Sequence, residues 1–395
     1  MSADSCPQRV SLWDIALAFL KLGTIAFGGP AAHIAMMEAE FVGRRQWLSR
    51  QEFLDRLGAA NLIPGPSSTE MAIFIGHSKR GWPGLIVAGC CFIVPAASLV
   101  AAIAAAYVRF GSLPRAGGIL YAVKPVVIAV ILQASWKLAR PAIKSVLLGV
   151  IGVMATMAVA LGADDLLVLA GAGVLAALPA LYARLRRPAG AASGMTSFKT
   201  LLPLKAKPAM AMTGLAAGLA STPFTFWRLF FTFLKIGCVL FGSGYVLLAF
   251  LRSDFVVRLH WLTEKQLLDA VAVGQVTPGP VFTTATFIGY LLGGVPGAMV
   301  ATVGIFLPGF LLVAISGPLI PRIRRSRLAG AILDGIIVAS LALMGVVTWQ
   351  LGRAALIDPL TIAIACLSAV LLFAFRLNAA WLILAAAIIG VIHGA

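Results

Sequence analysis

The sequence predicts an all-α polytopic integral membrane protein built from two related halves, and three observations lead to this fold class. Hydrophobic residues make up 61% of the 395 positions and charged residues only 11%, and the mean hydropathy is +0.99. These values exceed what the core of a water-soluble domain requires. Apolar runs long enough to cross a bilayer recur along the chain. A Pro-Gly-Pro break occurs once in each half, at 64–66 and 278–280.

The apolar runs fall into two series with the same plan. In each series, a polar and partly amphipathic segment that contains the Pro-Gly-Pro break separates the first run from the second. Most runs reach the length of roughly 17–25 residues that a transmembrane helix needs. The first series lies at 12–28, 82–109, 118–137, 141–160 and 164–183, and the second lies at 225–242, 295–320, 328–350, 356–375 and 378–394.

An internal repeat relates the two halves. Trp13 and Trp227 are 214 positions apart, and the same offset pairs residues of equal or similar type as far as the two Pro-Gly-Pro breaks. One deleted residue then changes the offset to 213, and the pairing continues. We therefore predict a first repeat at 1–183, a basic linker at 184–224 and a second repeat at 225–395.

Each Pro-Gly-Pro stretch indicates two half-helices with a break between them, because proline lacks the amide donor and suits the first turn of a new helix. We predict that each stretch enters and leaves the bilayer on one side, as a re-entrant hairpin, beside about ten full crossings. An odd number of crossings per half inverts the second repeat, as in many secondary transporters. Basic residues place the linker in the cytoplasm. If both stretches cross fully, the total is about twelve, and hydropathy leaves this alternative open.

The charge pattern limits the classes of function. The net charge is +17, but Lys and Arg lie in short clusters between apolar runs, as in cytoplasmic loops, so we expect no nucleic-acid partner. The cysteines and histidines lack metal-ligand spacing, and no G-x-x-x-x-G-K-[ST] nucleotide loop is present. We expect no cofactor, no metal and no enzymatic activity. The expected partners are an oxyanion and the lipid bilayer, and a homodimer stays open.

A lysine lies inside the first apolar run of each half, at Lys21 and Lys235, which occupy the same position of the repeat. A lysine at mid-membrane costs ~2.5–3.5 kcal/mol on insertion scales, so it usually faces a cavity or a partner. We interpret the pair as part of an anion-binding site. The alternative is snorkelling toward an interface or pairing with Asp55 and Asp269. Lys124 is a weaker third candidate, because the second half has no lysine at its position.

The half-helices that begin at the breaks direct unpaired amides and a positive dipole end toward the midplane, which favours an anion. Hydroxyl and amide donors suit an oxyanion, whose oxygens only accept hydrogen bonds. The Ser and Thr residues also suit helix capping, and the two roles can coexist. The predicted substrate-binding residues at the breaks are Asn61, Pro64, Gly65, Pro66, Ser67, Ser68, Thr69, Gln275, Pro278, Gly279, Pro280, Thr283 and Thr284.

Acidic residues near the breaks are candidates for ion pairing or proton movement. Glu70 lies in the first turn after the first break, where the second half has Thr284. It either interacts with the helix dipole or carries a proton, and the sequence leaves both roles open. Asp55 and Asp269 match across the repeat and are the second candidates. The predicted hinge residues are Gly28, Gly29, Gly242 and Gly244.

Several motifs resemble the chromate ion transporter (CHR) superfamily. The first half carries FGGPAAH at 27–33, NLIPGPSSTEM at 61–71 and GWPG at 81–84, and the second half carries FGSG at 241–244 and QVTPGPV at 275–281. The chain is similar over both halves to the long, fused form of this superfamily, in which two homologous units lie in one bacterial inner-membrane chain. The resemblance implies export of chromate, a tetrahedral dianion like sulfate, and chromate resistance.

We expect a secondary carrier that works by alternating access and is driven by the membrane potential, by proton exchange or by both. An inside-negative potential favours outward movement of an anion by ~2.3 kcal/mol per charge per 100 mV. A carrier or exchanger of sulfate or another oxyanion is the nearest alternative. Two further alternatives are a membrane enzyme acting on a phosphorylated lipid and a passive anion channel.

Overall fold

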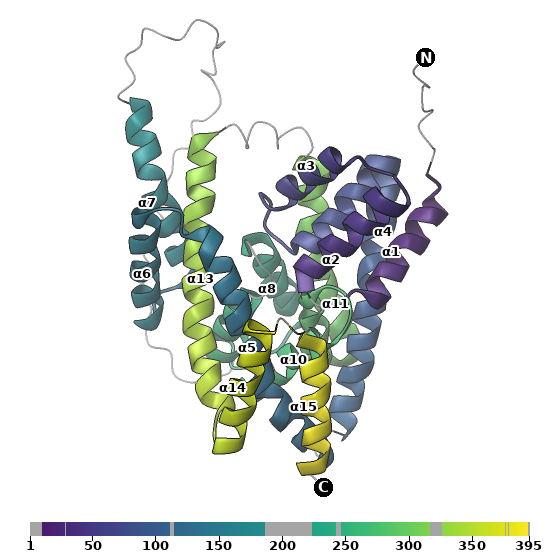
Figure 1. The fold of residues 1–395 in the computed structure, drawn as a ribbon, viewed down its shortest axis with the longest axis vertical. Helices are drawn as coiled ribbons and strands as arrows, with labels where there is room; N and C mark the ends of the chain where they lie inside the picture. The colour runs from purple at the N-terminus through teal and green to yellow at the C-terminus, as the bar shows by residue number, and fades with distance from the viewer. Residues whose placement is uncertain are drawn as a thin grey trace, which may run out of the picture.

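The computed structural model describes residues 10–27, 29–110, 114–185, 223–241, 246–316, 326–375, 377 and 379–393, and in these ranges it contains helices and no strand. Most of the predicted linker lies outside the described residues. The helices are α1 (Leu12–Ile25), α2 (Gly29–Glu38), η1 (Ala39–Arg44), α3 (Arg50–Ala60), α4 (Ser67–Phe110), α5 (Pro114–Ala142), α6 (Val146–Ala160), α7 (Asp165–Leu185), α8 (Phe226–Val239), α9 (Leu247–Leu251), η2 (Arg252–Arg258), α10 (Glu264–Val276), η3 (Val281–Thr283), α11 (Thr284–Ser316), α13 (Arg327–Ala355), α14 (Pro359–Phe373) and α15 (Ala379–His393) (Figure 1).

Long apolar helices identify a polytopic membrane protein. Five helices in the described part of the chain are long and apolar enough to cross a bilayer. They lie at Ser67–Phe110, Gly117–Ala142, Asp165–Tyr182, Val281–Ser316 and Arg327–Ala355. Shorter apolar helices lie at Val146–Ala160, Pro359–Phe373 and Ala379–Ile392.

The long helices α4 and α11 each fold back on themselves after a short first part. Gly81 has φ 58° and ψ −141°, and Gly294 has φ 61° and ψ −150°, a conformation that favours glycine. A Cβ added to Gly76 would collide with the backbone of Gly84. Eight residues of a straight helix span about 12 Å, so this collision requires the chain to reverse. Each of these two helices is therefore a hairpin with a short arm and a long arm.

The first helix of each half is shorter than the sequence indicates. The expected runs 12–28 and 225–242 become α1 and α8, which have 14 residues each. Helices of this length span about 21 Å, less than the roughly 30 Å of a hydrocarbon core. Neither helix has the length of a full crossing, which corrects the expectation. The helices end early because their last carbonyl groups meet the Pro-Gly-Pro break of the other half, as described below.

Helix α3 and the short arm of α4 form an antiparallel pair around the first break. Glu52 and Arg56, near the start of α3, interact electrostatically with Lys79, at the end of the short arm. The chain therefore runs inward along α3, turns at the break and returns. Helix α3 and the short arm of α4 thus form a hairpin around the first break, and the re-entry of this hairpin into the bilayer stays a prediction.

Local structure repeats between the halves in detail. Capping boxes start α3 at Ser49 and α10 at Thr263, 214 positions apart. Phe19 packs against Phe41 with ring centroids 4.9 Å apart, and the equivalent pair in the second half has the same separation. The internal repeat in the sequence is thus a repeat in structure.

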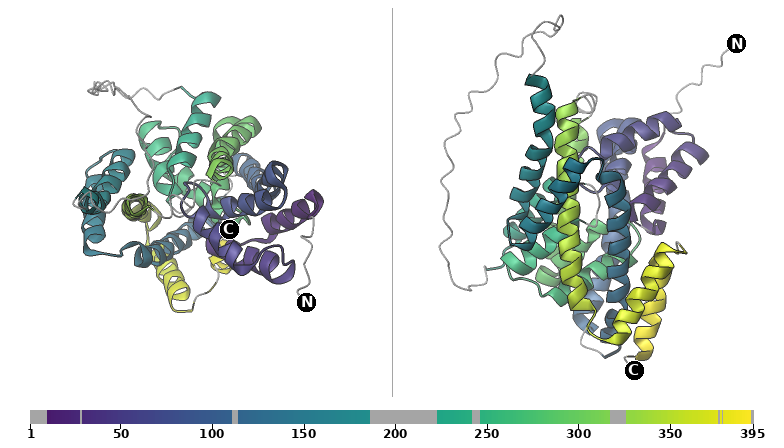
Figure 2. Two further views of the ribbon diagram at one scale, coloured as in Figure 1. Left: turned by 90° about the horizontal axis from the view of Figure 1, so that it is seen from above. Right: turned by 60° about the vertical axis from the view of Figure 1, so that its left-hand side comes forward.

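The two halves are interlocked by their later helices. In the first half, α5 packs on α14 and α15, whereas α13 of the second half packs on α6 and α7. Small residues permit these contacts, since a Cβ on Gly390 would collide with Gly118 and one on Gly335 would collide with Ala172. Figure 1 shows α6, α7 and α13 side by side, away from α1 to α4. Both further views in Figure 2 keep this separation.

The hairpin of α4 leads to a first prediction. We expect Gly76→Ala to destabilise the protein by at least ~1–3 kcal/mol, the usual cost of overpacking, because the new Cβ meets backbone that has no room to move. The melting temperature of the purified protein in detergent measures the effect. Gly345→Ala in α13 is the control, because its Cβ would point into open space. Equal melting temperatures for both variants would contradict the hairpin.

Candidate functional site

The two Pro-Gly-Pro breaks meet the first helices of the opposite halves. The N–H of Gly65 donates a 2.7 Å hydrogen bond to the carbonyl oxygen of Leu240, directly after α8. The N–H of Gly279 donates a 2.8 Å hydrogen bond to the carbonyl oxygen of Ala26, directly after α1. Donors and acceptors are each 214 positions apart in the chain, so this is one contact made twice with the halves exchanged. Such reciprocity is the property of a two-fold relation.

Both break glycines are required by backbone geometry. Gly65 has φ 136° and Gly279 has φ 92°, values that other residues rarely adopt. A Cβ on Gly279 would also lie 2.6 Å from the Cβ of Ala96 and 3.3 Å from the carbonyl oxygen of Gly23. The second break is thus held against both α1 and the long arm of α4.

The first turn of α4 buries its polar groups. Ser67, Ser68 and Thr69 are between 1% and 9% exposed. The N–H groups of Thr69 and Glu70 donate to the carbonyl oxygen of Pro66 at 2.8 and 3.0 Å. The amides of Ser67 and Ser68 come before any intrahelical acceptor. This helix start therefore offers donors at the centre of the molecule.

Glu70 is fully buried beside the first break. Its side chain is 0% exposed, and neither carboxylate oxygen has a hydrogen-bond partner among the described residues. A Cβ built on Gly65 would lie 2.5 Å from its Oε1, and one built on Gly309 of α11 would lie 3.8 Å from its Cγ. The acid therefore lies over the first break at the contact between the halves.

The second break is also closed. The hydroxyls of Thr283 and Thr284 donate to the carbonyl oxygens of Pro280 and Val281, each at 2.8 Å, so both threonines use their protons within their own turn. A space of about 10 Å³ next to this break is lined by Gln275, Val281 and Thr284 together with apolar residues. This is about the volume that one water requires. The conformation is closed to a tetrahedral oxyanion at this point.

A buried ion pair links the two halves behind the second break. Lys124 Nζ lies 2.8 Å from Asp269 Oδ1, and the side chains are 11% and 0% exposed. The Tyr107 hydroxyl donates to Asp269 Oδ2 at 2.9 Å. The cluster joins α5 and α4 to α10, so Lys124 has a defined partner although it lacks a counterpart in the repeat.

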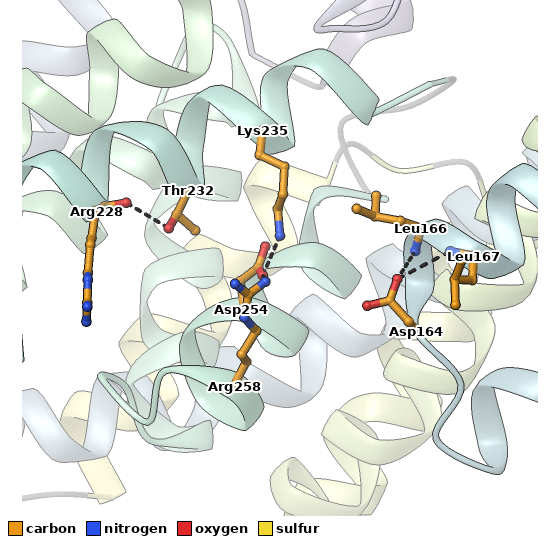
Figure 3. Close-up of polar contacts among 8 residues, drawn as sticks. All are labelled: Asp164, Leu166, Leu167, Arg228, Thr232, Lys235, Asp254 and Arg258. Carbon is orange, nitrogen blue, oxygen red and sulfur yellow. Dashed lines mark hydrogen bonds and ion pairs between the residues drawn. The ribbon is translucent and has the colours of Figure 1, made fainter. Parts of the chain in front are cut away.

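Lys21 and Lys235 do not lie at the breaks. Lys235 Nζ contacts Asp254 Oδ1 at 2.5 Å (Figure 3), so the pairing with Asp269 considered from the sequence is wrong for this lysine. Lys21 is exposed on the surface of α1. Asp55 is also exposed, and Gln51 donates to its carboxylate at 3.5 Å. In α1 it is Gly23, not the lysine, that approaches the second break.

Two buried polar residues escaped the sequence reasoning. Asp254 is 4% exposed, and its repeat partner Glu40 is also acidic, which was an available signal. His33 is 1% exposed, and its Nε2 lies 3.1 Å from the carbonyl oxygen of Ala26, the acceptor for the second break. No repeat signal marks His33, because its equivalent position falls in the second half at Leu247.

The remaining predicted residues have clear positions or lie outside the described part. Asn61 is exposed, whereas Pro64 is half-buried and forms the break with Pro66. Pro278 and Pro280 are buried at the second break. Gly29 starts α2 with φ 78°. The hinge predictions at Gly28, Gly242 and Gly244 fall outside the described residues.

Long apolar helices that meet at two buried breaks define a polytopic helical membrane protein with the broken-helix organisation of membrane transporters. The Chromate transporter family matches the chain twice, over residues 13–177 and 227–391. The chain belongs to this family, and each half of it carries one family unit.

Relatives match nearly the whole chain. It is 31% identical over 385 residues to the Chromate transport protein of Cupriavidus metallidurans, covering 97% of this chain and 93% of that protein. It is 32% identical to the Probable chromate transport protein of Synechococcus elongatus, with 88% and 86% covered. It is 29% identical to the Chromate transport protein of Pseudomonas aeruginosa, with 98% and 94% covered. No solved structure matches the chain.

The buried ion pair gives a second prediction. We expect Lys124→Met to cost ~3–5 kcal/mol of stability, because it leaves the Asp269 charge buried and unpaired. The double variant Lys124→Met/Asp269→Asn is expected to recover most of this loss. Thermal or denaturant unfolding in detergent measures the single variants Lys124→Met and Asp269→Asn and the double variant as a double-mutant cycle.

The pair of Lys144 and Asp334 is the matched control for this cycle. It has a similar distance of 2.6 Å but side chains that are 60% and 29% exposed. Lys144→Met should therefore cost at most ~1 kcal/mol. Additive losses from Lys124 and Asp269 would show that the two side chains do not interact.

Proposed function

We propose that this protein exports chromate from the cytoplasm as a secondary active carrier, with its substrate site at the two Pro-Gly-Pro breaks. The observation that carries the proposal is the reciprocal contact of the breaks, which brings the N-terminal ends of α4 and of η3 with α11 to the centre of an apolar molecule. Helix N-termini present free amides and a positive dipole end, the combination that binds oxyanions.

The proposed site consists of the residues that line the breaks. The first break contributes Gly65, Pro66 and the buried Ser67 to Thr69 turn. The second break contributes Gly279, Pro280 and the turn at 281–284, with Gln275 beside it. Lys21 and Lys235 would act at a distance, by attracting anions toward the entrances. The names of the relatives from Cupriavidus metallidurans and Pseudomonas aeruginosa support chromate as the oxyanion.

The proposed topology places two inverted repeats in a bacterial inner membrane, so that the two break hairpins re-enter from opposite sides. Without α1 and α8, four of the expected crossings remain in each half, an even number, so the wholly cytoplasmic linker that five crossings implied is not part of this proposal. The two-fold exchange of contacts supports this arrangement, because it relates the break and the first helix of one half to their equivalents in the other. The present conformation is closed around the second break. Alternating access would follow if each break opens toward the side from which its hairpin enters.

Glu70 is the proposed coupling residue. An unpaired buried carboxylate is costly to keep charged, whereas a carboxylic acid is not. A proton on Glu70 would therefore be exchanged as the oxyanion arrives or leaves, since both lie at the same break. The membrane potential would add ~2.3 kcal/mol per charge per 100 mV to the export of a dianion.

Transport into inverted membrane vesicles tests this proposal. We expect wild-type vesicles to accumulate chromate when the lumen is made positive, and to accumulate more when the lumen is also made acidic. Glu70→Gln should retain the response to potential and lose the response to the pH gradient. Glu52→Gln is the matched control, because Glu52 caps α3 on the surface. If Glu70→Gln responds to the pH gradient like the wild type, Glu70 does not couple protons.

The same assay separates the competing functions. Sulfate accumulation without chromate accumulation would identify a carrier for sulfate. A chromate gradient that collapses instantly, without any counter-transport, would identify a channel. Release of product from a phosphorylated lipid in detergent, without any vesicle, would identify an enzyme. Each outcome contradicts the export of chromate by a carrier.

A further inference from the structure

A second and larger pocket lies on the outer face of α8, away from the breaks. Its volume is about 500 Å³. The wall consists of five residues of α8 and two at the end of η2. These residues are Trp227, Arg228, Phe231, Thr232, Lys235, Arg258 and Leu259. Figure 3 shows the polar members of this wall with their hydrogen bonds and ion pairs.

The wall of this pocket carries three cations and, among the described residues, no carboxylate. Asp254 lies beneath it, with its side chain 5% exposed, and contacts Lys235 at 2.5 Å and Arg258 at 3.6 Å. Asp165 of α7 lies further back and accepts a hydrogen bond from Ser253. Three cations and two carboxylates leave a net positive charge, which lies on the open side of the pocket.

The cation at Arg228 is held loosely and is available to a ligand. Its Nη1 lies 3.5 Å from the carbonyl oxygen of Pro223, a long contact for a hydrogen bond. A guanidinium has five donors in a planar fork that matches two oxygens of a phosphate. Arg258 is 71% exposed and reaches Asp254 through one nitrogen, so most of its donors are also available.

Polar and aromatic side chains form neighbouring stripes on α8. Arg228, Thr232 and Lys235 follow each other at the spacing of one helix face, over about 10 Å of helix. Trp227 and Phe231 form the adjacent stripe and are 69% and 46% exposed. Exposed aromatic rings next to cations are typical of the boundary between lipid headgroups and acyl chains.

The first half shows that the fold does not require this pocket. Trp13, Lys21 and Arg44 occupy the positions of Trp227, Lys235 and Arg258. The position of Arg228, however, is taken by Asp14, which belongs to the capping box of α1. The second half thus has a cation at the mouth of the pocket where the first half has a capping acid.

We propose that this pocket binds the phosphate group of an anionic phospholipid, with the acyl chains lying along Trp227 and Phe231. Arg228 and Arg258 hold the phosphate oxygens, and Lys235 with Asp254 forms the floor. A free tetrahedral oxyanion has the same donor requirements, but it offers nothing to the exposed aromatic stripe. Basic pockets beside membrane helices bind anionic headgroups in the same way. The proposal does not depend on the transported substrate.

Binding of defined lipids to the delipidated full-length protein tests the proposal. The probes are phosphatidylglycerol, phosphatidylcholine, inorganic phosphate and chromate, measured by native mass spectrometry and by the shift in melting temperature. We expect phosphatidylglycerol to bind at least roughly tenfold more tightly than phosphatidylcholine, because both present the same phosphate but the quaternary ammonium of choline would be repelled by the three cations of the wall. Neither phosphate nor chromate should displace it at equal concentration.

Substitutions locate the lipid. Arg228→Ala and Arg258→Ala should each weaken phosphatidylglycerol binding by roughly tenfold, and Arg228→Asp, which copies the first half, should abolish the preference. Arg140→Ala is the matched control, because Arg140 is an exposed arginine stacked at 5.3 Å on the exposed Trp136. Arg258 also contacts Asp254, so its substitution can impair folding. If Arg258→Ala does not fold, the two Arg228 variants alone test the proposal.

Three results would overturn the proposal. The first is unchanged phosphatidylglycerol binding in folded Arg228→Ala and Arg228→Asp. The second is equal binding of phosphatidylcholine, which would show that the headgroup charge plays no part. The third is displacement of the lipid by free phosphate or chromate, which would assign the pocket to a soluble oxyanion.

Discussion

A hydrogen bond from the opposite half closes each Pro-Gly-Pro break, and the fold is organised around this exchange. Gly65 donates to Leu240 and Gly279 donates to Ala26. Inside a membrane, unpaired backbone groups are tolerated only where protein or a polar cavity satisfies them. Helices α1 and α8 therefore stop where their last carbonyls reach a donor, and neither half satisfies its own break. The later helices repeat the exchange, because α5 and α13 each pack against the other half.

The backbone is related by a two-fold axis, but the buried charges are not. The first break has Glu70, with no partner for its carboxylate among the described residues. The second has Asp269, neutralised by Lys124 and bonded by Tyr107. In the proposed cycle, the two breaks would therefore differ in the free energy of opening. An uncompensated acid responds to protonation, whereas a satisfied ion pair resists change.

The sequence predicted the backbone plan better than the side-chain partners. The 214-residue offset and the two Pro-Gly-Pro breaks can be identified from single matching residues, and they predicted where the half-helix after each break begins. The length of the apolar runs did not predict that α1 and α8 each end after 14 residues, because the N–H donors that meet their last carbonyl groups lie in the other half. The lysine partners were missed for a similar reason: the face of α8 that Lys235 occupies, and its contact with Asp254, depend on tertiary packing.

Hydrogen–deuterium exchange at the break glycines, read at single-residue resolution in lipid nanodiscs, tests the central claim most directly. If each break is closed by the opposite half, the amides of Gly65 and Gly279 are both strongly protected and to a similar degree. The amide of Gln51, in the exposed first turn of α3, should exchange far faster. Exchange of either glycine amide at the rate of Gln51 would contradict the reciprocal closure of the two halves.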